Sequence, residues 1–384
     1  MQVTVVRPDE LGAGELDRWR DFQRSTPALQ HAFLAPEFSV VAGRARPRAR
    51  VAVISEGPQL IGFFPFERSR FGVGTPVATN LTGCQGVVHA PGAGWDAAEL
   101  LRACGLSVWE FDCLVEGQAP FQPYARIQVP SPLMDLSAGW DAYLAELRRR
   151  SPSTTKKLGQ RRRRLDRDSG GAQFRHDTRD VGELRSLMSW KSEQYRRTGR
   201  SDRFTWTGVR QLLEELVETR TATFSGVLSS VYAGDRLAAV SLVLHSHTSA
   251  AAWFTGYDPA FAPYSPGMLV QLRAAEGAAG AGIHEVYLGR GTKDAYKQTL
   301  KSRDAVVSEG RVMRATPGAA LHWAGAAPTR RIRHLVTESP RLLKAADDTL
   351  HRYGRLRTSL RSASLPGAAL RTESDHLNRS RGPS

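Results

Sequence analysis

The 384-residue sequence has few cysteines, no long apolar run, and fewer acidic than basic residues. Its three cysteines, Cys84, Cys104 and Cys113, are too few and too scattered for a disulfide framework, and they lack the CxxC spacing of a zinc site. The apolar stretch 237–244 is far shorter than the roughly 18 residues of a membrane span, and the N-terminus does not read as a signal peptide. These absences predict a cytoplasmic protein without a transmembrane segment.

The composition is that of a globular protein with an unusual charge. Hydrophobic residues make up 41% of the chain and charged residues 24%, so a sizeable core can form. The length exceeds one ordinary domain of about 100 to 200 residues, which favours two domains. The 53 basic residues outnumber the 38 acidic ones, and the net charge of +15 favours anionic partners without naming a reaction.

Strand and helix patterns divide the chain into two α/β units and a tail. Residues 1–124 read as strand, helix, two strands, a helix at 96–104 and a strand at 107–114. From residue 125 the pattern restarts with two short strands, 125–130 and 133–137, followed by helices. We expect an α/β (α+β) fold with two mixed, mostly antiparallel sheets flanked by helices, in domains 1–124 and 125–314. The basic tail 315–384 is predicted to be partly disordered.

The segment 222–312 carries the clearest order of elements. It reads as three consecutive antiparallel strands, with turns at Gly234-Asp235 and at 247–249, then a helix, a strand, a short helix over 292–302 and a final strand. Between the third strand and the helix, Tyr264-Ser265-Pro266-Gly267 places proline and glycine where a helix begins. Free N–H groups and the positive dipole end attract phosphate there, although an ordinary loop-to-helix junction has the same pattern.

Four short motifs in this region resemble a known family. They are Gly256-Tyr257-Asp258, Tyr264-Ser265-Pro266-Gly267, Leu288-Gly289-Arg290-Gly291 and Tyr296-Lys297. Together they resemble the acyltransferase domain of the cellulose-biosynthesis type, within the GNAT acetyltransferase superfamily, over about residues 133–312. The resemblance implies a degenerate GNAT-like domain at the N-terminus, as in the peptidoglycan aminoacyl-transferring Fem ligases.

The resemblance implies acyl transfer from acetyl-CoA or another acyl-CoA to an amine or hydroxyl, without a metal. The donor would lie on the strand edge and helix start that contain Phe254, Gly256, Tyr257, Ser265, Gly267 and Met268. The superfamily's usual phosphate loop, a Gln or Arg followed by xxGxG or xxGxA, is incomplete here, because residues 262–268 contain one glycine, Gly267.

Acyl transfer needs a base for the nucleophile and a proton donor for the leaving thiolate. Tyr296 takes the acid position by resemblance, with a packing role as the alternative. Asp258, Glu285 and Glu193 are candidate bases. Substrate contacts are expected from Arg290, Lys297, Lys191 and Tyr195.

Two other chemistries find little support in the sequence. His245 and His247 alternate on a predicted strand, but no third metal ligand accompanies them, and buried histidines are common. Cys104 and Cys113 lack the neighbouring cation or base that activates a thiol.

The positive charge is concentrated in two segments. Residues 148–168 contain ten basic and two acidic residues, and residues 330–381 contain 12 and five, which accounts for the whole excess. A solvated helix is the ordinary explanation, and a ridge that binds an anionic surface or acceptor is the functional one. Both segments are expected to lie outside the donor site.

Three functions remain open at this point. The first is acyl-CoA-dependent transfer to a small-molecule or saccharide acceptor. The second is a Fem-like transfer from aminoacyl-tRNA, with residues 148–167 and the tail on the RNA; other nucleic acids are disfavoured because no aromatic residues interrupt the basic run. The third is a non-catalytic, anion-binding protein of GNAT fold.

Overall fold

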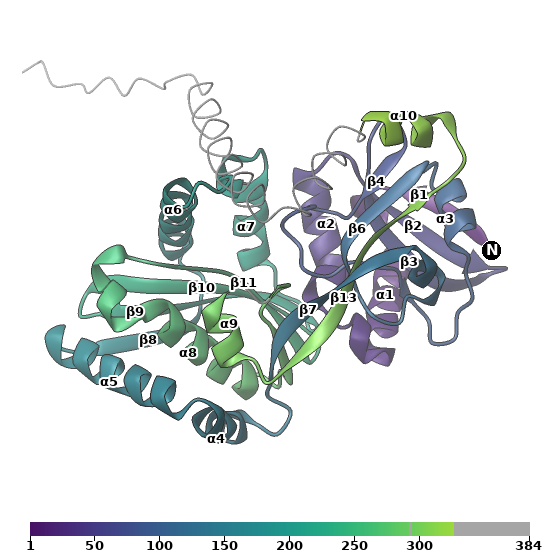
Figure 1. The fold of residues 1–384 in the computed structure, drawn as a ribbon. Helices are drawn as coiled ribbons and strands as arrows, with labels where there is room; N and C mark the ends of the chain where they lie inside the picture. Colours follow the sequence, from purple (N-terminus) through teal and green to yellow (C-terminus); the bar gives the residue numbers. More distant parts are fainter. Residues whose placement is uncertain (292–293, 326–384) are drawn as a thin grey trace, which may run out of the picture.

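The structure is a computed structural model that describes residues 1–291 and 294–325. One continuous sheet runs through both halves of this part of the chain (Figure 1). Its strand order is β1-β2-β3-β4-β6-β13-β7-β12-β11-β10-β9-β8, and β5 pairs with β3. The strands are β1 (Gln2–Val6), β2 (Ala49–Glu56), β3 (Gln59–Arg68), β4 (Val73–Thr75), β5 (Val88–His89), β6 (Val108–Leu114), β7 (Ala125–Asp135), β8 (Ala172–Thr178), β9 (Phe224–Ala233), β10 (Arg236–Ser246), β11 (Ser249–Tyr257), β12 (Glu285–Tyr287) and β13 (Arg303–Met313). Most pairs are antiparallel, while β4–β6 and β11–β12 are parallel.

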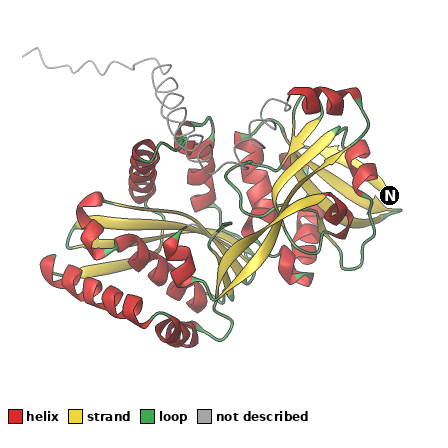
Figure 2. Ribbon diagram, in the orientation of Figure 1, coloured by secondary structure: helices red, strands yellow, loops and turns green. Residues whose placement is uncertain are grey.

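Helices cover both faces of this sheet (Figure 2). They are α1 (Ala13–Ser25), α2 (Pro36–Ala45), α3 (Ala97–Ala103), α4 (Trp140–Arg150), α5 (Pro152–Asp168), α6 (Val181–Arg197), α7 (Val209–Glu218), α8 (Pro266–Gly280), α9 (Ala295–Leu300) and α10 (Pro317–Gly325), and a 3-10 turn, η6 (Pro259–Tyr264), precedes α8. None of the helices in the described ranges is long and apolar enough to cross a bilayer. The predicted mixed, mostly antiparallel strand arrangement flanked by helices is confirmed, although the strands form one continuous sheet and not the two sheets that were expected.

Strand β10 packs against helices on both faces of the sheet. Its residues Val240, Leu242 and Leu244 are buried in the core shared with α6 and α7, while Val243 is buried in the core shared with α8. Successive side chains of a strand point to opposite faces, so a strand covered on both sides reads as a nearly continuous apolar run. The predicted meander β9–β10–β11 is confirmed, with turns at 234–235 and 247–248.

The two halves of the sheet meet at a ribbon formed by β7 and β13. The sequence predicted two short strands at 125–130 and 133–137, but β7 is one strand because β13 pairs with it from Ala125 to Leu133. Two prolines, Pro130 and Pro132, lie within β7. Their carbonyl groups accept hydrogen bonds from the N–H groups of Gly291 and Leu288, on the side of β7 away from β13. An N–H group at these positions would point to the same side, so the pairing of β7 with β13 loses no hydrogen bond to the prolines. The far edge of β13 pairs with β6.

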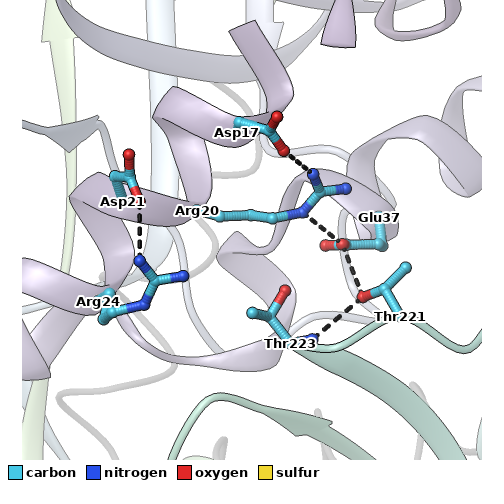
Figure 3. Close-up of polar contacts among 7 residues, drawn as sticks. All are labelled: Asp17, Arg20, Asp21, Arg24, Glu37, Thr221 and Thr223. Atoms are coloured by element: carbon cyan, nitrogen blue, oxygen red, sulfur yellow. Dashed lines mark hydrogen bonds and ion pairs between the residues drawn. The ribbon is translucent and has the colours of Figure 1, made fainter. Parts of the chain in front are cut away.

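A buried carboxylate connects the N-terminal and C-terminal halves of the chain (Figure 3). Glu37 on α2 accepts a hydrogen bond from Arg20 Nε at 2.9 Å and one from Thr221 Oγ1 at 3.0 Å. Arg20 also donates to Asp17 at 2.7 Å, and the backbone N–H of Thr223 donates to Thr221 Oγ1 at 3.3 Å. The hydrophobic core beneath includes residues of α1 and α2 as well as α6 and α7, so the halves share one apolar interior.

Helix α2 and the tail differ from the predicted secondary structure. Helix α2 was not predicted, because seven of its ten residues are buried and its apolar residues show no one-sided spacing. Within the tail that begins at residue 315, the structure contains α10. The rest of the predicted tail, 326–384, and residues 292–293 of the predicted short helix lie outside the described residues.

Candidate active site

Strands β11 and β12 pair over a short distance and then separate. Their parallel ladder joins Ser249 to Glu285 and ends at Ala251 and Tyr287. Beyond it, the chain after β12 turns to β7, where the Leu288 N–H donates to the Pro132 carbonyl at 2.8 Å, while β11 continues along β10 to Tyr257. Among the described residues, no strand pairs with this edge of β11 over 252–257, so its peptide groups have no strand partner.

A β-bulge lies where the separation begins. Leu242 pairs with Phe254 and Val243 with Ala252, which leaves Trp253 as an extra residue on β11. Bulges bend a strand and increase its twist, which accounts for the divergence of β11 from β12. The Trp253 indole donates to the Leu81 carbonyl at 2.7 Å and so anchors the bulge to the N-terminal half.

Helix α8 begins beside the end of the open edge. Ser265 is in the left-handed region at φ 54°, and its carbonyl accepts hydrogen bonds from the N–H groups of Met268 and Leu269. A Cβ on Gly267 would lie 3.3 Å from Tyr257 Cδ1, so glycine lets the helix start directly against β11. The positive end of the α8 dipole therefore lies next to the unpaired end of β11.

The basic helix α5 packs onto this helix start. Arg161 Nη1 donates to Ser265 Oγ at 2.5 Å, and Tyr264 OH donates to Asp168 at 2.8 Å. The guanidinium of Arg164 lies 5.5 Å from the centre of the Tyr264 ring. The expectation that the basic segment lies outside the donor site is therefore wrong at Arg161. Sequence spacing missed this contact because the two residues are 104 positions apart.

Tyr296 lies on α9 and, like Ala252 and Met268, packs against the buried apolar cluster that includes Val286 and Leu300. Burial, together with the smaller influences of Asp294 and Tyr195, raises the pKa of Tyr296 to about 12. Tyr195 lies on α6 and belongs to the core that α6 shares with α7. The Tyr296 hydroxyl keeps its proton at neutral pH.

Lys191 lies on α6, one turn before Tyr195. Its ammonium lies 5.2 Å from the centre of the Tyr195 ring, and Nζ donates to Gln194 Oε1 at 2.9 Å. Burial and, to a smaller extent, Arg200 and Arg203 lower the pKa of Lys191 to about 8, while Asp294 opposes them. About a tenth of the Lys191 side chains are therefore uncharged at pH 7. The sequence offers no signal for this shift, because its cause is burial.

Arg290 and Lys297 are engaged in bonds that hold the frame of the site. Arg290 donates to the Asp112 carbonyl at 2.6 Å and to Glu309 at 3.0 Å. Lys297 Nζ donates to the carbonyl groups of Gly289 and Arg290 at 3.2 and 3.1 Å. These contacts connect α9 and the segment before it to β6 and β13.

The three candidate bases lie in different surroundings. Asp258 caps η6 through the N–H of Ala260 and pairs with Arg236 at 3.1 Å. Glu285 pairs with Arg303 and accepts a hydrogen bond from Tyr287; it lies beside Ser249, at the opposite end of β11 from Asp258. Glu193 is exposed on α6. The structure therefore does not bring these carboxylates together.

Phe254 and Gly256, which were predicted to bind the acyl donor, have structural roles in the fold. The side chain of Phe254 is buried against Phe204, with ring centres 5.1 Å apart, so it can offer a ligand only its backbone. A Cβ on Gly256 would lie 3.0 Å from the Leu187 carbonyl oxygen, so glycine at this position lets α6 approach β11.

The remaining titratable groups belong to the interior. His245 is buried, which lowers its pKa to about 4, and β10 ends at Ser246, so His247 lies in the turn and not on the strand. Burial raises the pKa of Cys104 and of Cys113 to about 12. Within residues 1–291 and 294–325, no three metal-ligating side chains gather.

Comparisons with known proteins agree with this geometry. Residues 152–298 match the family model described as an acetyltransferase (GNAT) domain. No curated protein sequence matches the chain. The crystal structure of FemX superposes with a TM-score of 0.55 at 12% identity, covering 81% of this chain and 96% of FemX.

Other solved structures superpose with lower scores. The DUF2156 C-terminal domain of a candidate lysylphosphatidylglycerol synthetase from Agrobacterium fabrum has a TM-score of 0.49 at 15% identity, covering 82% of this chain and 96% of that domain. A tandem GNAT protein from the clavulanic acid biosynthesis pathway has 0.45 at 12% identity, with coverages of 81% and 98%. Residues 152–298 are therefore similar to a GNAT acetyltransferase domain, and the superposition on FemX shows a shared fold.

Proposed function

We propose that the protein transfers an acyl group, with acetyl as the first candidate, from acyl-CoA to an amine or hydroxyl of a small-molecule or saccharide acceptor in the cytoplasm. The observation that carries this proposal is the open edge of β11 over 252–257, which lies next to the start of α8. Residues 125–314 would form the catalytic domain, of the cellulose-biosynthesis type, and residues 1–124 a degenerate copy.

The donor fits this open edge by simple chemistry. The amides of a pantetheine arm pair with the free peptide groups of β11, in the manner of an added strand. The N-terminus of α8, with Gly267 and Met268, and the guanidinium of Arg161 offer positive charge to the pyrophosphate. The phosphate loop, residues 262–268, contains one glycine, and the guanidinium of Arg161 adds positive charge beside it.

The acceptor nitrogen or oxygen attacks the thioester carbonyl, and the carbon–sulfur bond breaks. Lys191 Nζ, uncharged in part near neutral pH, takes the proton of the nucleophile, and the Tyr296 hydroxyl gives a proton to the departing thiolate. Both groups then return to their starting states by exchange with solvent. The geometry favours Lys191 as the base over Asp258 and Glu285, whose carboxylates are held in ion pairs.

Calorimetric titration with acetyl-CoA tests the donor site directly. Wild-type protein is expected to bind the donor, and Tyr296→Phe is expected to bind it equally well while transfer to a panel of amines and sugars slows strongly. Tyr124→Phe is the matched control, because Tyr124 lies before β7 and packs against the core of the N-terminal half. Absence of binding at millimolar acetyl-CoA would refute the proposal.

A second function, transfer from aminoacyl-tRNA, is favoured by one observation. FemX shares the fold over most of both chains, and α5 presents a row of basic side chains beside Ser265. Salt-sensitive binding of aminoacyl-tRNA, lost in a variant with Arg161–Arg164 neutralised, would support this function over the first. Binding of neither donor would leave a non-catalytic, anion-binding protein.

A further inference from the structure

A groove of about 510 Å³ lies between α4, α5, β8 and α8, on the outer side of α8. This volume is within the range of roughly 300 to 1,000 Å³ that is typical of small-molecule sites. Its walls are mostly apolar: Leu144 from α4, Leu158 and Leu165 from α5, Phe174 from β8, and Leu269 and Leu272 from α8. Leu144, Phe174 and Leu272 remain partly exposed, so apolar surface is open to solvent in the groove.

The groove is long enough for an extended chain. Leu158 and Leu165 both line it from α5, and seven residues of helix span about 10 Å. Gly159 lies between them on the same wall, where the lack of a side chain leaves the groove open. A Cβ on Gly159 would meet nothing closer than Arg163 Nη1, at 3.6 Å, so the backbone does not require glycine there.

The rim of the groove is positively charged. Arg148 from α4 and Arg162 from α5 line it and are exposed, and neither makes an ion pair with a described residue. Arg273 from α8 is paired with Glu276, which also lines the rim, so these two residues balance each other. Two guanidinium groups on two walls match the two charges and three oxygens of a phosphate monoester better than the single charge of a carboxylate.

We propose that this groove binds an anionic amphiphile, with one alkyl chain along the leucines of α4, α5 and α8 and a phosphate head between Arg148 and Arg162. Such a molecule comes either from a membrane or from a pool of free phosphorylated lipid, and both share this chemistry. The binding needs no acyl transfer and stands apart from the proposed function.

The experiment uses octyl, decyl and dodecyl phosphate as monomers, titrated calorimetrically into the full-length protein. The affinity is expected to rise about fourfold per methylene, the increment of burying one methylene group, and to fall as salt is added. An affinity that does not depend on chain length would overturn the groove site.

Two double variants separate the groove from the general charge of α4 and α5. The double variant Arg148→Gln/Arg162→Gln is expected to bind decyl phosphate about a hundredfold more weakly, because it loses two charged hydrogen bonds. The control Arg163→Gln/Arg167→Gln removes the same charge from residues of α5 that do not line the groove, and it should bind as the wild type does. Equal losses in both variants would contradict the proposal.

Gly159→Leu tests the apolar part without weakening the fold. The added side chain fills the groove, and replacing a glycine inside a helix favours the helical state. We expect lost binding of decyl phosphate together with an unchanged or higher melting temperature, which distinguishes a blocked groove from an unfolded one. Retained binding would overturn the proposal.

Vesicles identify the source of the ligand. Sedimentation with vesicles that contain phosphatidic acid, compared with vesicles of neutral lipid, shows whether the groove takes a lipid from a bilayer. Monomer binding with or without vesicle binding supports the groove. Vesicle binding without any binding of monomers would refute it and leave α5 as a charged surface.

Discussion

Arg161 on α5 donates a 2.5 Å hydrogen bond to the hydroxyl of Ser265, the residue that precedes α8. The side chain is otherwise exposed, so its guanidinium can contact a ligand at the helix start. The basic segment 148–168 therefore contacts the start of α8, where the helix dipole is positive. Arg161 is thus bonded to Ser265 and is not only solvated.

Arg161→Gln is expected to weaken acetyl-CoA binding by about tenfold, because a charged hydrogen bond to phosphate contributes about 1.5 kcal/mol or more. The turnover number at saturating donor should change little, since Arg161 lies away from the thioester. Calorimetry and steady-state kinetics measure the two effects. Arg163→Gln on the same helix is the control, and an equal loss there would assign the effect to general charge.

The pH dependence of transfer reports the ionisation of Lys191. Because its pKa is lowered from 10.5 to about 8, the uncharged amine that accepts a proton becomes the main form as pH rises past 8. We expect kcat/KM to rise with pH and to level off above that value. In Lys191→Arg, whose side chain stays charged, the rise should disappear; a rise that persists would remove Lys191 from the role of base.

The same shift predicts a stability effect with a defined sign. The unfolded chain holds the Lys191 proton up to pH 10.5, whereas the folded protein releases it near 8, so the unfolded state binds more protons between these values. The Lys191 contribution to the free energy of unfolding therefore rises with pH across this window. Urea unfolding of the wild type and of Lys191→Met at both ends of the window measures it, and identical pH slopes would contradict it.

Gly256→Ala is expected to lower the free energy of unfolding by about 1 to 3 kcal/mol, because the new methyl group would press on the Leu187 backbone. Gly14→Ala in α1 is the matched control: its added Cβ meets nothing within 4 Å, and alanine favours a helix. Chemical denaturation measures both variants. A neutral Gly256→Ala would show that α6 can shift away from β11.

Glu37→Ala should destabilise the protein by about 2 to 4 kcal/mol, since it leaves Arg20 and Thr221 without their shared partner in a buried site. Glu56→Ala, at an exposed position on β2, is the control and is expected to change little. Thermal unfolding compares them. An effect no larger than that of Glu56→Ala would mean that the apolar core alone holds the halves together.

The order of elements was predictable wherever the local pattern was strong. The meander β9–β11 and helix α8 follow from alternation, from the Gly234-Asp235 turn and from Pro266 at the helix start. The Trp253 bulge was not predictable, because it is a matter of register between two strands. The Arg161–Ser265 contact and the low pKa of Lys191 were also beyond reach, since both arise from packing between segments far apart in the sequence.

The pairing of β13 with both β6 and β7 affects how the protein is made. During synthesis the first 114 residues emerge early, but β6 has an unpaired edge until residues 303–313 leave the ribosome. An open strand edge is a site for pairing with other chains, so the nascent N-terminal half is exposed to aggregation for most of translation. A ribosome that stalls before residue 303 would therefore release a chain whose N-terminal sheet is incomplete.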